Sequence, residues 1–337
     1  MTRARVALRV NGWTRAAALV LLVSAAVTSF AQTPAWKPDR NIELILGTPP
    51  GSPNDVAART IEKILRERKI VEVPVVVVNK PGGGLAASWI YLNQHPRNGH
   101  FIALSALNLL SNHITGASPL HHSDLTPIAQ LFSEYIVFSV KADSPIQTGR
   151  DLIERLRKDP ASVTIGVSPG PGGANHATMA MVMKAAGIDF RKAKFVFFNA
   201  AVDSSTATLG GHVDVCATTS SSVIGHVQSK RMRMIAAAAP KRLGGELAPV
   251  PTWKEQGIDV VGDTFRGIVA PKDTPEAQVV YWENVFERLT QTDEWKADVR
   301  TRLWEMNYMG SRDSRRYLDA QYAAQKAILT DLGLARP

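Results

Sequence analysis

Short apolar runs rich in β-branched residues alternate along this chain with segments whose apolar residues recur at helical spacing. The runs predict strands, and the segments between them predict helices. In the first third of the chain we expect strands at residues 41–46, 74–79 and 101–104, with helices at 55–69 and 85–93. Alternation of this kind is typical of a mostly parallel sheet covered by helices on both faces.

The same alternation resumes further along the chain. Strands are expected at residues 162–167, 194–198, 213–218 and 232–238, with helices at 174–186 and 204–209. The C-terminal part is expected to be helical, because apolar residues there keep a core-facing spacing. One helix opens with Thr274 as N-cap and Pro275 at its first position and runs to residue 289, and a second covers residues 314–332.

Two further apolar runs, at residues 135–140 and 265–270, are extended and flanked by polar or turn residues. The chain is longer than one compact domain of about 100 to 150 residues, which favours two lobes. We therefore expect these runs to carry the chain from one α/β lobe to the other and back. On this division one lobe comprises residues 32–136 together with 265–337, and the other comprises residues 137–264.

The N-terminus has the pattern of a secretory signal peptide. Four arginines and no acidic residue precede or flank an apolar segment at residues 16–27, and the small residues Ser29 and Ala31 take positions −3 and −1 of a cleavage site. The segment is shorter than the roughly 20 residues that span a bilayer. We expect cleavage after Ala31 and export of the mature chain.

Charge and cysteine content narrow the possible partners. The whole chain carries a net charge of +9, and removal of the signal peptide leaves 35 basic against 30 acidic residues, a scattered excess that favours anionic ligands. No basic tract is interleaved with aromatic residues, so we expect no nucleic-acid partner. The single cysteine, Cys216, lies in an apolar run and is expected to be a buried, inert thiol.

Three turns between strands and helices are built almost entirely from small residues. GTPPGSPNDVAARTI at residues 47–61 follows the first strand, NKPGGG at 79–84 follows the second, and SPGPGGANHA at 168–177 follows the strand at 162–167. A helix N-terminus carries a partial positive charge and unpaired N–H groups, which suit a carboxylate or phosphate. The carboxyl ends of strands face the ligand crevice in open α/β sheets. An anion site between these turns is one interpretation.

The alternative is that these turns are simple connections. In the first of them, Ser52 and Asp55 form a capping box and Pro53 takes the first helical position, so the side chains satisfy the helix donors themselves. A nucleotide site is disfavoured, because the glycines are followed by Leu85 and Ala174 instead of the Gly-Lys-Ser/Thr ending of a phosphate-binding loop.

A hydrolase is the competing enzyme class. Residues 166–170 read GVSPG, the GxSxG outline of a nucleophile elbow, and Asp214 and His226 follow Ser168 in the order found in α/β hydrolases. In such an elbow the residue after the serine donates its backbone N–H to the oxyanion, and Pro169 has none. Loss of such a donor costs on the order of 3 kcal/mol of transition-state stabilisation. A secreted α/β serine esterase acting on carboxylic esters through Ser168 therefore stays the alternative.

The histidines do not predict a metal site. His121 and His122 are adjacent, and adjacent side chains point apart on a helix or strand. His176 differs because it falls in the first turn of the helix that follows Ser168. There it either donates to a ligand anion or orients the glycine loop, and the sequence leaves both roles open.

Several of these motifs together resemble the Bug-type (TctC-like) periplasmic solute-binding receptors of tripartite tricarboxylate transporters. The resemblance rests on residues 49–59, NKPGGG at 79–84, the glycine loop that ends at His176, LGGHVD at 209–214, VPTWKEQG at 250–257 and Ala270-Pro271, in order and register. It implies a type II periplasmic-binding-protein fold, in which two α/β lobes are joined by crossing strands that act as a hinge and close on a small carboxylate-bearing solute.

The resemblance also implies where such a solute binds. Family members hold one carboxylate with backbone N–H groups of a loop from each lobe. The corresponding candidates are Pro50, Gly51, Ser52, Pro53, Asn54 and Asp55 in the first loop, Ser168, Gly170, Gly172, Gly173, Ala174, Asn175 and His176 in the second, and Asn199, Ala201, Thr218 and Thr219 around a third. The family usually has more glycine at Ser52 and Pro53, a hydroxyl residue at Gly173, and Lys-Gly-Ser near Asn199.

The function implied is that of a receptor without catalytic residues, metal or cofactor. We expect a monomer in the periplasm that binds a small organic anion and presents it to the membrane components of a tripartite tricarboxylate transporter, or alternatively to a sensor kinase. Dicarboxylates, aromatic carboxylates, amino acids and nicotinate-like solutes all present the same group to the turns. The sequence does not choose among them.

Overall fold

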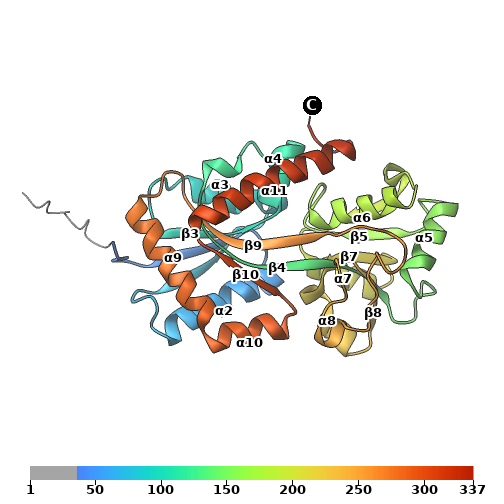
Figure 1. The fold of residues 1–337 in the computed structure, drawn as a ribbon, viewed down its shortest axis with the longest axis horizontal. Helices are drawn as coiled ribbons and strands as arrows, with labels where there is room; N and C mark the ends of the chain where they lie inside the picture. Colours follow the sequence, from blue (N-terminus) through green and yellow to red (C-terminus); the bar gives the residue numbers. More distant parts are fainter. Residues whose placement is uncertain (1–35, 337) are drawn as a thin grey trace, which may run out of the picture. The chain divides into compact units, whose positions relative to one another are not determined.

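The structure is a computed structural model, and it describes residues 36–336. The expected signal peptide at residues 1–31 lies outside this range. Within it, helices and strands alternate as the sequence predicts, and the strands join in the order β2-β1-β3-β9-β4-β7-β5-β6 (Figure 1). Strands β10 and β8 pair with β4 beside this path.

One half of the sheet is built on β1 (Ile42–Leu46). It pairs in parallel with β2 (Val75–Asn79) and with β3 (Phe101–Ala106). Its helices are α2 (Pro53–Glu67), α3 (Ala86–Asn93), α4 (Asn108–Thr115), α9 (Glu276–Gln291), α10 (Asp293–Thr301) and α11 (Ser311–Asp331). Leu44 and Leu46 of β1 pack in a core with Trp282 of α9 and Trp295 of α10.

The other half is built on β5 (Thr164–Val167), which pairs in parallel with β6 (Lys194–Phe197) and β7 (Val215–Thr219). Strand β8 (Met232–Ala237) lies beside β4. Its helices are α5 (Gly149–Lys158), α6 (Ala174–Ala185), α7 (Ala201–Leu209) and the short α8 (Ile224–Gln228). A second core gathers Phe138, Leu152, Ile165 and Trp253.

Two long strands join the halves. Strand β4 (Thr126–Lys141) pairs with β9 (Asp263–Ala270) and β10 (Glu305–Met309) along its first part, and with β7 and β8 from Ile136 onward. All these pairs are antiparallel, as is β3 with β9. The expected parallel sheet is therefore found within each half, whereas the crossing strands make the whole sheet mixed. Figure 1 shows β4 and β9 running side by side through the middle of the molecule.

The C-terminal helix contacts both halves. Leu329 of α11 is fully buried together with Ile114 of α4 and Ala177 of α6. In Figure 1, α11 runs above the sheet, past α4 and toward the half that contains α6. Lys184 of α6 also forms an ion pair with Asp331 at the end of α11. This helix therefore bridges the gap between the lobes on the side of α4.

Several element boundaries differ from the sequence-based expectations. Pro275 is the N-cap residue of α9, not its first helical residue, and the Thr274 hydroxyl donates to the Pro271 carbonyl (2.7 Å) instead of capping. Helices α4, α5, α8 and α10, strand β10 and the first part of β4 were not predicted. Helix α5 did carry a signal, since Thr148 and Asp151 form a reciprocal capping box.

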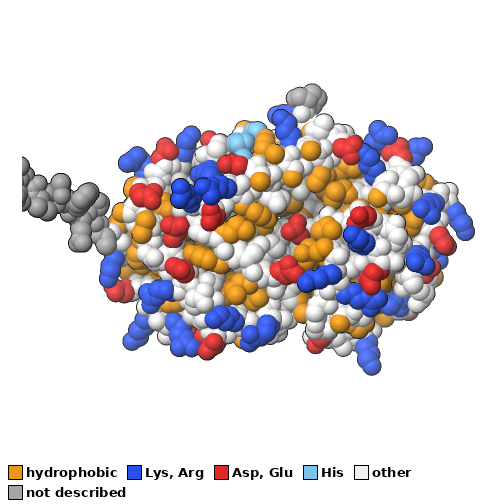
Figure 2. All heavy atoms as spheres, in the orientation of Figure 1, with side chains coloured by type: hydrophobic (Ala, Val, Ile, Leu, Met, Phe, Trp, Pro, Cys, Tyr) orange, Lys and Arg blue, Asp and Glu red, His pale blue; other side chains and the backbone are white. Residues whose placement is uncertain are grey.

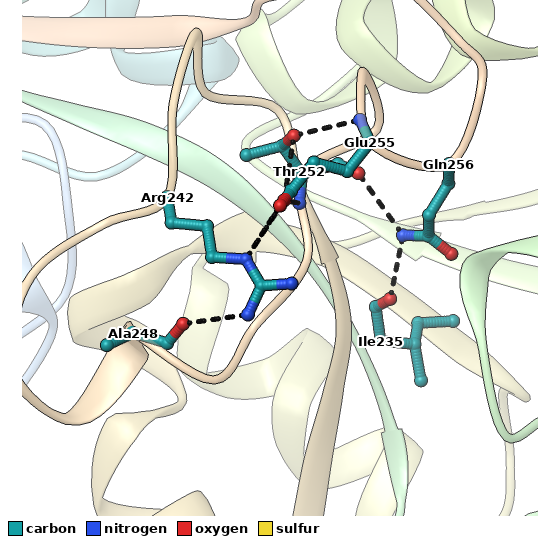
Figure 3. A network of polar contacts seen from close by, with 6 residues as sticks. All are labelled: Ile235, Arg242, Ala248, Thr252, Glu255 and Gln256. Atoms are coloured by element: carbon teal, nitrogen blue, oxygen red, sulfur yellow. Dashed lines mark hydrogen bonds and ion pairs between the residues drawn. The ribbon is translucent and has the colours of Figure 1, made fainter.

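The loop from β8 back to β9 is held by a polar network (Figure 3). Thr252 Oγ1 accepts from the Glu255 N–H (3.1 Å). In return, the Glu255 carboxylate accepts from the Thr252 N–H at Oε2 (2.8 Å) and from Arg242 Nε at Oε1 (2.8 Å). Gln256 Nε2 donates to the Ile235 carbonyl of β8 (3.2 Å). Because this loop leads into β9, the network fixes how the returning crossing strand leaves the second half.

The surface shows no single-sign patch on the face drawn in Figure 2, where Lys and Arg side chains are interspersed with Asp and Glu over both halves. This agrees with the mild, scattered positive excess of the sequence. Between residues 36 and 336, no helix has both the length and the apolar character needed to cross a membrane.

Candidate ligand-binding site

The first small-residue turn ends in a well-capped helix. Ser52 Oγ accepts from the Asp55 N–H (3.2 Å) and donates to Thr48 Oγ1 (2.7 Å). The buried Asp55 carboxylate accepts from the Gly51 N–H (2.9 Å), from Arg59 and from Asn79 Nδ2 (3.0 Å). Burial opposes ionisation of Asp55, but these hydrogen bonds outweigh it and hold its pKa below the ordinary value. Asp55 therefore supports the turn from behind.

The second turn is held by side chains of the helix that follows it. Asn175 Nδ2 donates to the Ser168 carbonyl (2.6 Å), and His176 Nδ1 accepts from the Gly172 N–H (3.0 Å). The His176 ring is buried edge-on against Phe195 and Phe197. Burial lowers the pKa of His176 to about 4, so the imidazole is neutral near pH 7. Of the two roles left open, the geometry supports orientation of the loop.

A cavity of about 50 Å³ lies where these turns meet the crossing strands. It is lined by parts of both halves of the sheet: Thr48, Ser52, Pro53, Asn54, Leu85, Ala106, Asn108, Ser168, Pro169, Ala174, Asn175, Asn199, Ala200, Ala201, Thr218, Thr219, Ser222, Thr264 and Arg266. Larger hollows exist on the outer surface, such as one of about 760 Å³ beside α9, but no small-residue turn opens into it.

The structure brings ten of the candidate residues to this cavity and keeps seven away from it. Those that line it are Ser52, Pro53, Asn54, Ser168, Ala174, Asn175, Asn199, Ala201, Thr218 and Thr219. Those that do not are Pro50, Gly51, Asp55, Gly170, Gly172, Gly173 and His176. The second group shapes the loops, either through backbone conformation, as at Gly170 and Gly172 with φ of +92° and +74°, or through internal hydrogen bonds.

Three helices begin at the cavity, and two of them have no side-chain cap. Ser52 caps α2, whereas the N-cap residues Gly173 of α6 and Ala200 of α7 provide no side-chain acceptor. The first N–H groups of a helix have no partner within the helix and carry partial positive charge. The starts of α6 and α7 therefore offer a carboxylate several unclaimed backbone donors.

Two buried hydroxyls add to these donors. Ser168 and Thr218 line the cavity, and their hydroxyls are buried without a hydrogen-bond partner within residues 36–336. Buried polar groups are normally paired, because leaving one unpaired costs about 1 to 3 kcal/mol. A ligand that accepts hydrogen bonds would relieve both.

The second turn also touches α4 from the other half of the sheet. Asn108 Nδ2 donates to the Pro169 carbonyl (3.4 Å). A Cβ atom on Gly172 would lie 2.6 Å from Thr115 Cγ2, closer than such atoms approach. The two halves are thus in contact across the cavity, and only glycine permits this approach.

The serine-hydrolase arrangement is not assembled. Ser168 follows the last residue of β5, whereas Asp214 precedes β7 and accepts from the N–H of Thr164, the first residue of β5 (2.8 Å). Since β5 and β7 are parallel, Ser168 and Asp214 lie at opposite strand ends, about 13 Å apart at roughly 3.3 Å per residue. Ser168 Oγ also has no histidine partner among the residues described.

The cysteine is not an accessible nucleophile. Cys216 is fully buried, and burial raises the pKa of its thiol to about 11. In the part of the chain from residue 36 to 336, no group of three or more His, Cys, Asp or Glu side chains is arranged to hold a metal ion.

Sequence reasoning missed several lining residues, of which Asn108 and Arg266 carry the most polar functionality. Asn108 opens a helix that was not predicted. Arg266 did leave a signal, as the only charged residue in the apolar run FRGIVA at 265–270. The pairing of β9 with both β3 and β4 places this arginine at the cavity.

Known proteins resemble this chain over most of its length. A UPF0065 protein from Cupriavidus necator is 29% identical over 324 residues, covering 95% of this chain and 96% of the relative. The solved periplasmic binding protein BugD is 19% identical with a TM-score of 0.80, covering 89% of this chain and 100% of that chain. An R. palustris protein solved with adipate is 20% identical with a TM-score of 0.81, covering 88% and 99%.

These structural likenesses show that the chain has the two-lobed fold of periplasmic binding proteins. The model of the "Tripartite tricarboxylate transporter family receptor" family, TctC, matches residues 57–334, which is most of the chain. The protein therefore belongs to the TctC family of tripartite tricarboxylate transporter receptors.

Proposed function

We propose that this protein is a periplasmic receptor that binds a small carboxylate-bearing metabolite between its lobes and delivers it to the membrane components of a tripartite tricarboxylate-type transporter. The observation that carries the proposal is the convergence of two helix starts without side-chain caps and two unpartnered hydroxyls on one cavity. The adipate-bound R. palustris protein, which shares the fold, supports a carboxylate ligand.

Binding requires the lobes to part and close again. The cavity of about 50 Å³ is well below the several hundred Å³ of typical ligand pockets, so a metabolite enters only when the second turn moves away from α4. Strands β4 and β9 are the connections about which such a hinge motion would occur. A ligand that bridges both lobes binds the closed form better and shifts the population toward it.

We also propose the lobe boundaries, the cleaved signal peptide and the monomeric state that the sequence predicts. The lobes comprise residues 32–136 with 265–337, and residues 137–264, and residues 1–31 are a cleaved signal peptide. The mature protein acts as a monomer, without cofactor or catalytic residue. The alternative is that the ligand-bound receptor acts on a sensor kinase instead of a transporter.

A thermal-shift screen of the purified mature protein against a panel of carboxylates tests the proposal. We expect at least one to raise the unfolding midpoint, because a ligand that binds only the folded state stabilises it by mass action. Calorimetry should then show that Ser168→Ala and Thr218→Val each weaken binding about two- to tenfold, the loss of one net hydrogen bond.

Ser139→Ala is the matched control. Ser139 of β4 is also buried with an unpartnered hydroxyl, but it does not line the cavity, so its loss should leave the affinity unchanged. If no carboxylate in the panel raises the unfolding midpoint, the proposal is contradicted. So would turnover of an activated ester that Ser168→Ala abolishes, since that result favours the esterase alternative.

A further inference from the structure

Among the described residues that line the cavity, Arg266 is the one with a cationic side chain. It lies on β9, where it pairs with Ala106 of β3 on one side and Phe132 of β4 on the other. Its side chain reaches the cavity and is only 9% exposed. The crossing strands thus place a positive charge at the boundary between the lobes, in a position that solvent scarcely reaches.

Three hydrogen bonds fix the orientation of this guanidinium. Its Nε donates to Asn54 Oδ1 (2.6 Å), and its Nη1 donates to Thr264 Oγ1 (2.9 Å) and to the Phe265 carbonyl (2.8 Å). A guanidinium has five N–H groups, two of them on Nη2. Within the described residues no acceptor takes the Nη2 protons, so this edge of the fork is held in place and left free.

All three acceptors are neutral, so the charge itself lacks a close partner. Between residues 36 and 336, no carboxylate oxygen forms an ion pair with Arg266 within 4.0 Å. Arg59, by contrast, has such a partner in Asp55. A buried charge without a counter-charge is costly, and proteins normally pair it.

The nearest compensation comes from Glu134 of β4, which is almost fully buried and has one carboxylate oxygen without a hydrogen-bond partner in the described chain. Burial raises the pKa of Glu134, which weakens its value as a counter-charge. Burial also lowers the pKa of Arg266, but an arginine stays protonated in proteins. The cavity therefore keeps a positive charge that no carboxylate of the described residues contacts directly.

We propose that Arg266 determines ligand specificity by pairing, through its free Nη2 edge, with a second anionic group of the ligand. This inference rests on the receptor function proposed above. In this proposal the first carboxylate binds at the starts of α6 and α7, and Arg266 lines the same cavity from the crossing strand β9. The site thus favours short molecules with a carboxylate at each end over monocarboxylates of equal length.

Matched pairs of acids test this selectivity directly. Succinate and butyrate, glutarate and pentanoate, and adipate and hexanoate each differ only by replacement of a carboxylate with a methyl group. Dissociation constants measured by calorimetry give a diacid preference for each pair. We expect the wild-type protein to prefer the diacid of at least one pair by roughly ten- to a hundredfold, the contribution of hydrogen bonds to a charged group.

The variant Arg266→Gln keeps hydrogen-bonding capacity and removes the charge. We expect its preference to fall to about threefold or less, while the affinity for the monocarboxylate changes little. Arg233→Gln is the matched control. Arg233 of β8 is also part-buried and donates to the backbone carbonyls of Ala142, Ser144 and Ile146, but it does not line the cavity, so the preference should stay at the wild-type value.

The outcomes separate this inference from the receptor function. Equal binding of diacids and monoacids by the wild type, or an unchanged preference in Arg266→Gln, overturns the role of Arg266 and leaves the receptor proposal standing. The same loss in Arg233→Gln also overturns it. If no acid binds the wild type, the receptor proposal fails, and this inference fails with it.

A folding control keeps the experiment decisive. Should Arg266→Gln not unfold cooperatively on heating, Arg266→Lys replaces it. A lysine keeps the charge but loses the planar fork and its bonds to Asn54 and Thr264. We expect its diacid preference to fall several-fold, and a wild-type preference in Arg266→Lys overturns the inference.

Discussion

His176 makes the stability of this protein depend on pH in a defined interval. Its ring is buried behind the second turn, where Nδ1 accepts from the Gly172 N–H and the ring faces Phe195 and Phe197. Protonation would bury a charge and turn the acceptor into a donor that faces another donor. The perturbation is therefore a decrease in pH. The matched variant is His176→Asn, whose side-chain oxygen can accept from the same N–H without titrating.

The magnitude follows from the displaced pKa. In the unfolded chain His176 has an ordinary pKa near 6.5, and in the folded protein burial lowers it to about 4. Between these values the unfolded state binds a proton that the folded state does not, so stability falls as the pH falls. The contribution of His176 is complete above about pH 6.5 and declines by roughly 3 kcal/mol by about pH 4, at 1.36 kcal/mol per pKa unit.

Urea denaturation of both proteins at intervals from about pH 7.5 to about pH 4 provides the measurement. The difference in unfolding free energy between wild type and His176→Asn cancels the titration of the shared groups. We expect this difference to shift by about 3 kcal/mol against the wild type as the pH falls. A difference that stays constant across the interval would show that the folded protein protonates His176 as readily as the unfolded chain, which refutes the burial argument.

Two further predictions concern the turns. Gly172→Ala should weaken binding of the tightest acid in the panel, because the new Cβ collides with Thr115 Cγ2 in the closed form. Calorimetry should show that binding recovers when Thr115→Ser is added, since this change removes Cγ2. Gly187→Ala is the control and should bind normally, because its φ of +75° imposes similar backbone strain but its Cβ would lie in open space. Asp55→Asn should lower the unfolding free energy in urea by about 2 kcal/mol at neutral pH, because charge-assisted bonds from Gly51, Arg59 and Asn79 are weakened. The half-exposed i,i+4 pair of Glu62 and Arg66 is the control, and a loss as large in Glu62→Gln would contradict this reasoning.

Local pattern was sufficient to predict most strands and their turns. The apolar run at 42–46 and the Ser52 cap predict where β1 ends and α2 begins, because both depend on neighbouring residues alone. The start of α6 after its glycines follows in the same way. Helix α4 was missed because polar residues such as Asn108, Ser111 and Asn112 are buried in it beside the apolar ones, so residue polarity in the sequence does not mark a core-facing side.

The identity of the cavity residues depends on contacts that a local pattern does not contain. Arg266 occupies a strand whose neighbours on both sides are distant in sequence, Ala106 and Phe132. A lone arginine in an apolar run is normally interpreted as a solvent-facing position on a half-buried strand. Only the antiparallel placement of β9 between β3 and β4 turns that position toward the cleft.

Two glycines of the small-residue turns also lie elsewhere than the sequence suggested. Their small size suggested room for a ligand beside them, yet Gly172 and Gly84 do not line the cavity. A Cβ on Gly172 would meet Thr115, and one on Gly84 would lie 3.2 Å from both the Pro169 carbonyl and Asn112 Oδ1. In both cases the missing side chain lets a turn of one lobe approach the other. The small residues therefore permit this close contact, and residues slightly further along each turn, such as Asn54 and Asn175, line the cavity.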